Sequence, residues 1–386
     1  MKNRIPLLLI VLCISVHSHG AALEKSGQSI LPFFEKGNYA EFSVGQIHAD
    51  ISGKNANTGF SSGNLVDDYR LFQATIKAQL HSQVSIGLLL DQPFGVKVNY
   101  FYAPEASSDH APSEAVNVDI KTYNITALTG FQPTVNWNFY AGLTRQRFEG
   151  NIHLFGKNYS FLNGYNAQFK PDDATGWLLG LNYQRPEIAL RTSLTYRSKV
   201  KHRVRTTELS PLYNLSEHST AIDTPQSVNF DFMSAISTSN LIFGTVRWVN
   251  WEDFEIQPAG FQSILNPYIH IPSITDLKLI NYQSDQWSAK LGIAHLLNEK
   301  LYLSAETSWD SGSNNPASAT NPANGYNGIG AGFRYNISPK TFVSSGLYYL
   351  KLKPAKPDTI SLAVSSLSTL EDKDVWAYGF KVSHYF

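Results

Sequence analysis

Residues that could do acid–base, nucleophilic or metal chemistry are scattered along this chain. None of its 11 histidines is spaced from another ligand as in a zinc motif, and no glycine-rich phosphate loop is present. His295 and His384 stand in segments that alternate like strands, where a lone histidine is usually an interface or lumen residue. An enzyme is the alternative, but no nucleophile–base pair is visible. We expect no catalytic residue, no metal and no cofactor.

The first 22 residues have the composition of a secretory signal peptide. Two basic residues precede an apolar run that ends at Val16, and small residues follow it. The run is too short to cross a membrane as a helix, although a buried N-terminal helix would look similar. Cys13 could suggest a lipoprotein, but Leu12 stands where a lipidation motif needs a small residue. We predict that residues 1–22 are a signal peptide and that the mature chain has no cysteine.

Composition favours an exported β-protein over a helical membrane protein. The chain has 31 basic and 31 acidic side chains, so no basic excess points to nucleic acid. Aromatic residues make up 13% of the chain, while the mean hydropathy is only −0.21. No segment after the signal approaches the roughly 20 apolar residues that a transmembrane helix needs. Strands that alternate between lipid and lumen fit this balance.

The clearest strand is the last one, which runs to the final residue, Phe386. Its even positions from Trp376 onward are mostly apolar or aromatic, and its odd positions are mostly small or polar. This period of two is typical of a strand between lipid and lumen. A terminal aromatic is similar to the C-terminal signal that outer-membrane barrels present to their insertion machinery. We therefore expect Phe386 to contact that machinery.

Two other alternating segments carry charges on one face only. A charge facing lipid at mid-bilayer would cost several kcal/mol, so these charges are predicted to face the lumen. They are Arg191, Arg197, Glu306 and Asp310.

The strand candidates and their connections predict the fold. Short turns and long polar loops alternate along the chain, which requires an even number of strands and places both termini on the short-turn side. A soluble β-sandwich would not explain this alternation. We predict an all-β, transmembrane antiparallel barrel of about 14 strands in the bacterial outer membrane, spanning residues 39–386. The candidates are 39–51, 68–80, 84–101, 114–131, 137–155, 173–184, 188–205, 225–236, 241–256, 276–296, 301–311, 325–336, 342–353 and 374–386.

Several segments together resemble the FadL/TodX family of outer-membrane transporters of hydrophobic compounds. The resemblance covers nearly the whole mature chain, from about Tyr39 to Phe386. The segments that carry it are Gly176-Trp177, Gly180-Leu181-Asn182-Tyr183, Thr195 to His202, Thr224-Pro225-Gln226-Ser227-Val228, Trp248 to Phe254, Gly292-Ile293-Ala294 and Gly330 to Tyr335.

The resemblance implies a fourteen-stranded barrel that binds a hydrophobic ligand near the extracellular loops. It also implies sideways release of the ligand into the bilayer at a kink in the third strand. Here that strand contains Pro93, Phe94 and Gly95. Pro93 cannot donate a ladder hydrogen bond and Gly95 permits a bulge, so we expect the wall to open at these residues. The alternative is that the strand ends at Gln92 and Pro93 begins a loop.

Two regions depart from the family pattern. The family's long N-terminal plug has an Asn-Pro-Ala motif, whereas only the short segment 23–38 precedes the first strand here. Phe33 and Phe34 could form an abbreviated stopper inside the barrel, or they could be aromatic residues at the membrane interface. Arg147 lies in a stretch similar to one where a family arginine approaches the ligand's carboxylate. Strand parity instead places it with lipid-facing residues. Either the strand slips through a bulge, or Arg147 lies at the outer interface near lipopolysaccharide.

The sequence thus predicts a non-enzymatic transporter of hydrophobic molecules, with long-chain fatty acids as the expected cargo. A diffusion pore, adhesin or other structural barrel is the alternative. A polar pore should be ringed with charge, and only 16% of the residues are charged. The expected partners are hydrophobic small molecules, outer-membrane lipids and lipopolysaccharide. The resemblance implies a monomer.

Overall fold

The computed structural model of the chain contains one large closed antiparallel sheet. The structure describes residues 23–55, 64, 66–102, 114–268, 270, 277–312, 324–353 and 367–386, so the predicted signal peptide lies outside the described residues. The sheet has 17 strand segments, and its last segment pairs with its first. Three wall positions are each filled by two successive segments, so the sheet is a barrel of 14 strands. The predicted fold class is confirmed.

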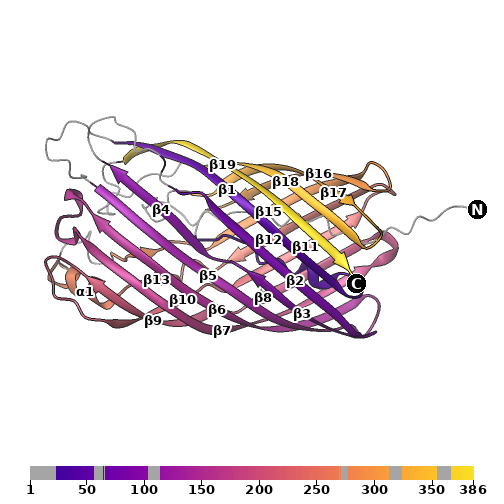
Figure 1. Cartoon of the computed structure of the whole chain (residues 1–386), viewed down its shortest axis with the longest axis horizontal. Coiled ribbons are helices and arrows are strands. Elements are labelled where there is room, and N and C mark those ends of the chain that lie inside the picture. Colours follow the sequence, from indigo (N-terminus) through magenta and orange to yellow (C-terminus); the bar gives the residue numbers. More distant parts are fainter. Residues whose placement is uncertain are drawn as a thin grey trace, which may run out of the picture.

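The barrel strands follow one another around the wall in chain order (Figure 1). The three split strands are β3 with β4, β8 with β9, and β10 with β11. The segments are β1 (Tyr39–Asn55), β2 (Tyr69–His81), β3 (Val84–Asp91), β4 (Gly95–Tyr102), β5 (Glu114–Phe131), β6 (Trp137–Phe155), β7 (Tyr165–Arg185), β8 (Leu190–Arg197), β9 (Val200–Leu209), β10 (His218–Thr224), β11 (Ser227–Ala235), β12 (Asn240–Val249), β15 (Gln286–Leu296), β16 (Leu301–Asp310), β17 (Tyr326–Asn336), β18 (Thr341–Leu352) and β19 (Leu367–Tyr385).

The two faces of the wall differ as the alternation predicts. Large apolar side chains are exposed on the outside, where they would meet lipid. The charges predicted to face the lumen do so, since Arg191 and Asp310 are almost completely buried. Arg197 contacts the N-terminal segment inside the barrel, and Glu306 pairs with Lys290. Exposed aromatic side chains on the wall include Phe42, Phe72, Trp137, Phe139, Trp177, Phe230, Trp287, Trp309, Phe333, Trp376 and Phe380.

Several predicted strand boundaries are wrong. Strands β7 and β19 begin at Tyr165 and Leu367, earlier than the predicted residues 173 and 374. In two further regions the residues that fill the barrel mask the alternation. Segment 206–224 was expected to be a loop, but β9 runs to Leu209 and β10 begins at His218. Buried polar residues such as Thr206 and Thr220 continue the inward face there and hide the alternation. Residues 250–256 and 276–285 were expected to extend β12 and β15. Instead they fold inward, where apolar side chains such as Phe254 are buried inside the barrel.

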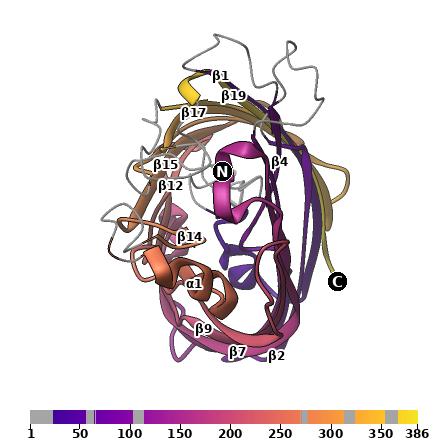
Figure 2. The ribbon, with the colours of Figure 1, turned by 90° about the vertical axis from the view of Figure 1, so that its left-hand side faces the viewer.

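The described residues also form short helices and one small sheet that are not part of the barrel wall. No helix among them is long and apolar enough to cross a membrane. The end of the barrel that carries the long connections, here called the loop end, holds α1 in its mouth (Figure 2). The opposite end, with the short turns and the C-terminus, is the turn end. The elements are η1 (Leu31–Phe34), η2 (Lys157–Leu162), η3 (Pro186–Ile188), α1 (Ala259–Leu265), η4 (Asn266–Tyr268), and the paired strands β13 (Glu255–Ile256) and β14 (Ile280–Asn281).

Glu208 fixes α1 to the inside of the wall. Its carboxylate accepts hydrogen bonds from the backbone N–H groups of Gly260 and Phe261, at 2.8 and 2.7 Å. The hydroxyl of Tyr165 donates to the same carboxylate at 2.7 Å. These bonds satisfy two N–H groups at the start of the helix, which would otherwise be buried without partners. Phe261 and Ile264 are then held inside the barrel mouth.

The tight packing of the wall against Tyr140 gives a test of the fold. A Cβ added to Gly180 would lie 2.3 Å from the Tyr140 hydroxyl and 2.6 Å from the backbone oxygen of Leu194. We expect Gly180→Val to destabilise the barrel by about 1–3 kcal/mol or more, since overpacking forces backbone shifts. The fraction of protein that stays folded in unboiled detergent gels should fall. Ala141→Val, at an exposed position on the lipid face of β6, should leave that fraction unchanged. Equal folding of both variants would contradict the packing described here.

Candidate functional site

The wall is interrupted in its third strand, between β3 and β4. Both segments pair with β5, but Asp91 stands opposite Asn124 whereas Gly95 stands opposite Lys121, so the register shifts by one residue. The three residues between the segments include Pro93, which has no N–H to donate. Pro93, Phe94 and Gly95 are all buried. The strand therefore resumes after Pro93, and the break lies within the wall and not at its rim.

The break leaves part of the neighbouring strand β2 without a partner on the side that faces β3 and β4. The β2–β3 ladder stops at the pair Ala74–Leu90. The next pairing among the described residues is an isolated bridge between Val66 and Val98. Between these points the N–H of Phe72 donates to a side chain, Gln92 Oε1, at 3.2 Å. A stretch of wall between barrel strands 2 and 3 thus lacks its backbone ladder.

The start of the N-terminal segment takes up the backbone groups that the break exposes. The Pro93 carbonyl accepts from the N–H groups of Lys25 and Ser26, at 2.7 and 3.2 Å. The N–H of Gly95 donates to the carbonyl of Leu23 at 2.7 Å. In a membrane an unpaired buried backbone group costs several kcal/mol, so these bonds stabilise the interrupted strand. The chain from Leu23 to Ser26 closes the break from inside.

Gly95 and Thr122 define the shape of the break. A Cβ on Gly95 would lie 2.4 Å from the backbone oxygen of Ile120, and its φ of +153° disfavours other residues. The Thr122 hydroxyl donates to the Phe94 carbonyl at 2.8 Å and accepts from the Phe94 N–H at 2.9 Å. The Phe94 carbonyl also accepts from the Thr122 N–H at 3.0 Å, so on the β5 side only the Phe94 N–H depends on a side chain in place of a backbone partner.

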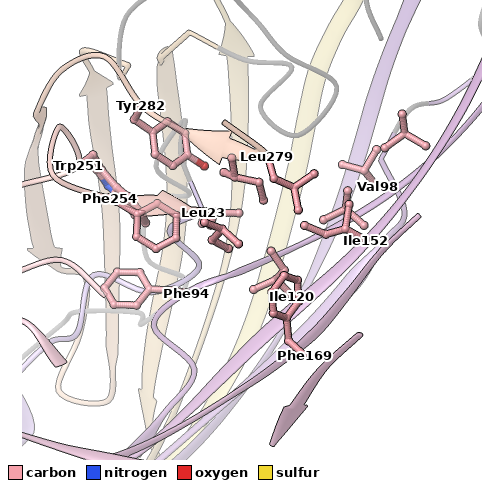
Figure 3. Close-up of a cluster of buried hydrophobic side chains, with 14 of the residues drawn as sticks. Leu23, Phe94, Val98, Ile120, Ile152, Phe169, Trp251, Phe254, Leu279 and Tyr282 are labelled. Atoms are coloured by element: carbon pink, nitrogen blue, oxygen red, sulfur yellow. The ribbon is translucent and has the colours of Figure 1, made fainter. Parts of the chain in front are cut away.

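An apolar cluster fills the loop-end half of the barrel and reaches the break (Figure 3). Phe94 points from the break onto Trp251, with ring centroids 5.4 Å apart in an edge-to-face arrangement. Trp251 also contacts Phe254 and Tyr282, at 5.2 and 5.0 Å. Burial raises the pKa of the Tyr282 phenol, so its hydroxyl stays neutral in this setting. Aliphatic side chains from the wall complete the cluster, including Val98, Ile120, Ile152 and Val204.

Below this cluster, toward the turn end, the interior holds buried charged groups beside a second, smaller apolar cluster. The Arg247 guanidinium is buried and pairs with Glu24 of the N-terminal segment. It also donates to Gln28 Oε1 at 3.0 Å and to Asn229. The half-buried Arg197 donates to the Gln28 carbonyl at 2.6 Å. A buried ion pair needs such additional hydrogen bonds to offset its desolvation. The segment is thereby fixed across the lumen.

The predicted stopper residues Phe33 and Phe34 lie inside the barrel and not at the membrane interface. Phe33 is fully buried. Its ring packs so closely on Gly87 and Gly130 that a Cβ added to either glycine would lie only 2.7 or 2.9 Å from a ring carbon. Phe34 packs on Tyr140 with ring centroids 5.2 Å apart. Both rings lie in a second cluster, separate from the one that contains Phe94. The residues at the break are instead those from Leu23 to Ser26.

Arg147 does not belong to the interior site. Its side chain is 53% exposed on the outer face of the wall, where it lies 3.8 Å from Asp173. Phe139 and Leu143 are exposed on the same face, whereas Gln146 and Phe148 point inward. The suggested contact between Arg147 and a ligand inside the barrel is therefore wrong, and strand parity gives the correct side.

Sequence reasoning expected residues 23–38 to be an abbreviated plug that could enter the lumen, but it missed the contacts of residues 23–28 with the wall and the roles of Arg247 and Trp251. The two buried carboxylates of residues 23–38, Glu24 and Glu35, were a usable signal, because a carboxylate inside a barrel needs a cationic partner.

Residues 59–63 read Gly-Phe-Ser-Ser-Gly, the spacing of a nucleophile motif, but the strand-to-helix context is lacking because β1 and β2 flank them. These residues lie outside the described part of the chain.

Solved structures of outer-membrane transporters share this fold. A FadL homologue from Pseudomonas aeruginosa is 14% identical, with a TM-score of 0.64 and 92% of each chain covered. The toluene transporter TodX of P. putida is 13% identical, with a TM-score of 0.62, 96% of this chain and 93% of that chain covered. The toluene transporter TbuX of Ralstonia pickettii is 12% identical, with a TM-score of 0.59, 95% of this chain and 96% of that chain covered. No match was found among curated proteins.

A family model described as outer membrane protein transport protein (OMPP1/FadL/TodX) matches residues 34–386. This match covers the whole barrel together with the last part of the segment that lies inside it. The fourteen-stranded wall agrees with a location in the outer membrane. The chain belongs to the OMPP1/FadL/TodX family of outer membrane transport proteins.

Proposed function

We propose that this protein carries hydrophobic compounds, with long-chain fatty acids as the cargo, and releases them sideways at the break in barrel strand 3. One observation carries the proposal: Phe94, within the break, packs on Trp251 in the middle of the apolar cluster. A hydrophobic compound held among these side chains would lie directly against the interrupted wall. Two of the similar structures are named toluene transporters, so a monoaromatic hydrocarbon is the competing cargo.

The charged half of the interior favours lateral over axial release. An apolar molecule gains about 25 cal/mol per Å² of surface that it removes from water. Moving it toward the turn end would instead require displacing buried groups such as Glu24, Arg247 and Arg191 from their partners. Moving sideways requires the chain from Leu23 to Ser26 to leave the break, which separates Glu24 from Arg247 but leaves the pair of Arg191 with Glu35 in place. The lipid outside then takes up the compound.

The remaining partners are proposed at the surface of the barrel. Phe386 is 52% exposed at the turn end, and it is the proposed contact for the insertion machinery. Arg147 and its neighbour Arg145 are exposed above the lipid-facing residues of β6, where lipopolysaccharide is the proposed partner. Phe33 and Phe34 are proposed to hold the N-terminal segment in place through their packing.

Uptake of labelled oleate by cells lacking their own hydrophobic transporter tests the proposal. Wild type should restore uptake, and the double variant Pro93→Ala with Gly95→Val should insert but lower uptake at least ten-fold. The valine would clash with the Ile120 carbonyl, so β3 and β4 could not keep the break. A lipid-facing change in the neighbouring strand, Ala127→Val, should transport like wild type.

Two results of this experiment would count against the proposal. Undiminished uptake by a correctly inserted double variant would exclude release at strand 3. Failure of wild type to take up oleate, with rapid entry of small polar solutes into vesicles that contain it, would identify a diffusion pore. Uptake of toluene without uptake of oleate would retain the transport function and correct the cargo.

The contact between Arg247 and Glu24 gives a second prediction. Removing one partner of a buried ion pair costs about 3–5 kcal/mol, so Arg247→Ala should release the N-terminal segment from the lumen. Residues 23–38 should then be cut by protease in the purified barrel, and conductance across planar bilayers should rise. Arg205→Ala is the matched control, because Arg205 is 70% exposed and pairs with Glu217 at the surface. A segment that stays protected in Arg247→Ala would show that this pair does not hold it.

A further inference from the structure

The wall has a second discontinuity, between β7 and the split strand β8–β9. The β7–β8 ladder ends at the pair Leu178–Arg197, and the β7–β9 ladder begins only at Phe169–Thr206. All residues between these pairs are described, and none of them is paired across this boundary. At its edge the Ser198 N–H donates to the Trp177 carbonyl at 2.9 Å. We call this boundary, between residues 170–177 and 198–205, the seam.

Two offset changes of strand phase explain why the ladder stops. On β7 the inward side chains are odd-numbered up to Phe169 and even-numbered from Gly176. The register between β6 and β7 shifts where this happens, next to Pro171. On the partner strand the inward side chains change from odd to even at Ser198-Lys199, which belong to neither β8 nor β9. If the register of the two ladders continued between these changes, each β7 residue and its partner would point to opposite faces of the wall. Paired residues must point to the same face, so the ladder stops.

Side chains close the seam where the backbone does not. Oδ2 of Asp172 lies 2.9 Å from Nδ1 of His202 and accepts from the N–H of Arg203 at 3.4 Å. Nε2 of His202 lies 3.1 Å from Oε1 of Gln146, which also accepts from Thr224 at 2.7 Å. A few side-chain contacts can separate without the loss of a continuous ladder. The seam is therefore easier to open than the regular wall.

The two sides of the seam differ in polarity. Inside, Phe148 contacts both Phe169 and His202, with ring centroids 6.2 and 5.7 Å apart, and both phenylalanines belong to the apolar cluster. Outside, Trp177 and Tyr196 form an aromatic pair at the lower end, as expected at a membrane interface. The exposed charged residues Arg145, Arg147, Asp173, Lys201 and Arg203 lie beside and above that pair.

We propose that the seam is a side entrance, by which apolar compounds at the head-group level of the outer leaflet reach the apolar cluster. This inference rests on the proposed function and adds a separate way in to the way out at strand 3. An entrance at this height lets a compound reach the cluster without passing the α1 connection in the barrel mouth. The residues that open it are Asp172 and His202, and the ligand class is an uncharged or weakly amphipathic hydrocarbon.

A reversible disulfide across the seam tests the proposal. The chain has one cysteine, Cys13, in the predicted signal peptide, so introduced cysteines react only with each other. A Cβ on Gly176 would lie 2.7 Å from Val200 Cγ2, which puts the two Cβ atoms within about 4 Å, as a disulfide requires. The oxidised Gly176→Cys, Val200→Cys variant should lose at least ten-fold in initial uptake of an apolar compound, and a reductant should restore it.

A matched pair in the regular ladder is the control. Leu181 and Leu194 are paired across β7 and β8, so Leu181→Cys with Leu194→Cys gives a disulfide in the same two barrel strands. Its uptake should not depend on oxidation. Wild-type uptake by the fully oxidised seam variant, with the disulfide verified by mass spectrometry, would overturn the proposal.

A second measurement does not depend on transport. The purified seam variant is placed in vesicles that contain a diazirine-bearing alkane, and the labelled residues are identified after illumination. The reduced protein should be labelled at Phe169 or Val204, and oxidation should lower this labelling relative to that at Phe94, which lies at the break in strand 3. If wild type transports no apolar compound, the proposed function fails. The labelling alone then shows whether the seam admits apolar compounds to the cluster. Absent labelling at Phe169 and Val204, or a ratio to Phe94 labelling that oxidation does not change, would overturn the proposal.

Discussion

Backbone hydrogen bonding is the constraint on which this barrel depends, because a membrane offers no water to an unpaired N–H or carbonyl. Along most of the wall the neighbouring strand supplies every partner. At the break between β3 and β4 the partners come from inside, from Leu23, Lys25 and Ser26. The N-terminal segment therefore has two effects that cannot be separated. It supplies hydrogen-bond partners to the backbone of an interrupted strand, and it occupies the space that an exit through that strand would use.

The interior is divided along the barrel axis in a way that suits a hydrophobic cargo. The loop-end half collects the aromatic rings of Trp251, Phe254 and Phe94, which offer apolar contact and few polar groups. The turn-end half holds buried ion pairs such as Arg247 with Glu24 and Arg191 with Glu35. An apolar compound is stabilised in the first half and would have to break charged contacts in the second. The division gives transport a direction without any covalent chemistry.

Much of the wall could be predicted from the sequence, because lipid on one face imposes a period of two that is visible in most strands. Pro93 and Gly95 also marked the break, since the missing N–H of proline and the wide range of glycine backbone angles can be read from single residues. The interior could not be predicted in the same way. Glu24 meets Arg247 across more than two hundred residues of chain, and no periodicity reports such a contact. The parity of β6 did place Arg147 outside, where a four-residue similarity suggested the opposite.

The most direct measurement is a crystal structure of the protein with a brominated long-chain fatty acid, in which anomalous scattering locates the bromine atoms. If the apolar cluster binds the cargo beside the break, a bromine peak should lie inside the barrel, in contact with Trp251 and Phe94. Peaks found only on the outer belt of exposed aromatic side chains would contradict this. They would show that the fatty acid dissolves around the barrel and does not bind within it.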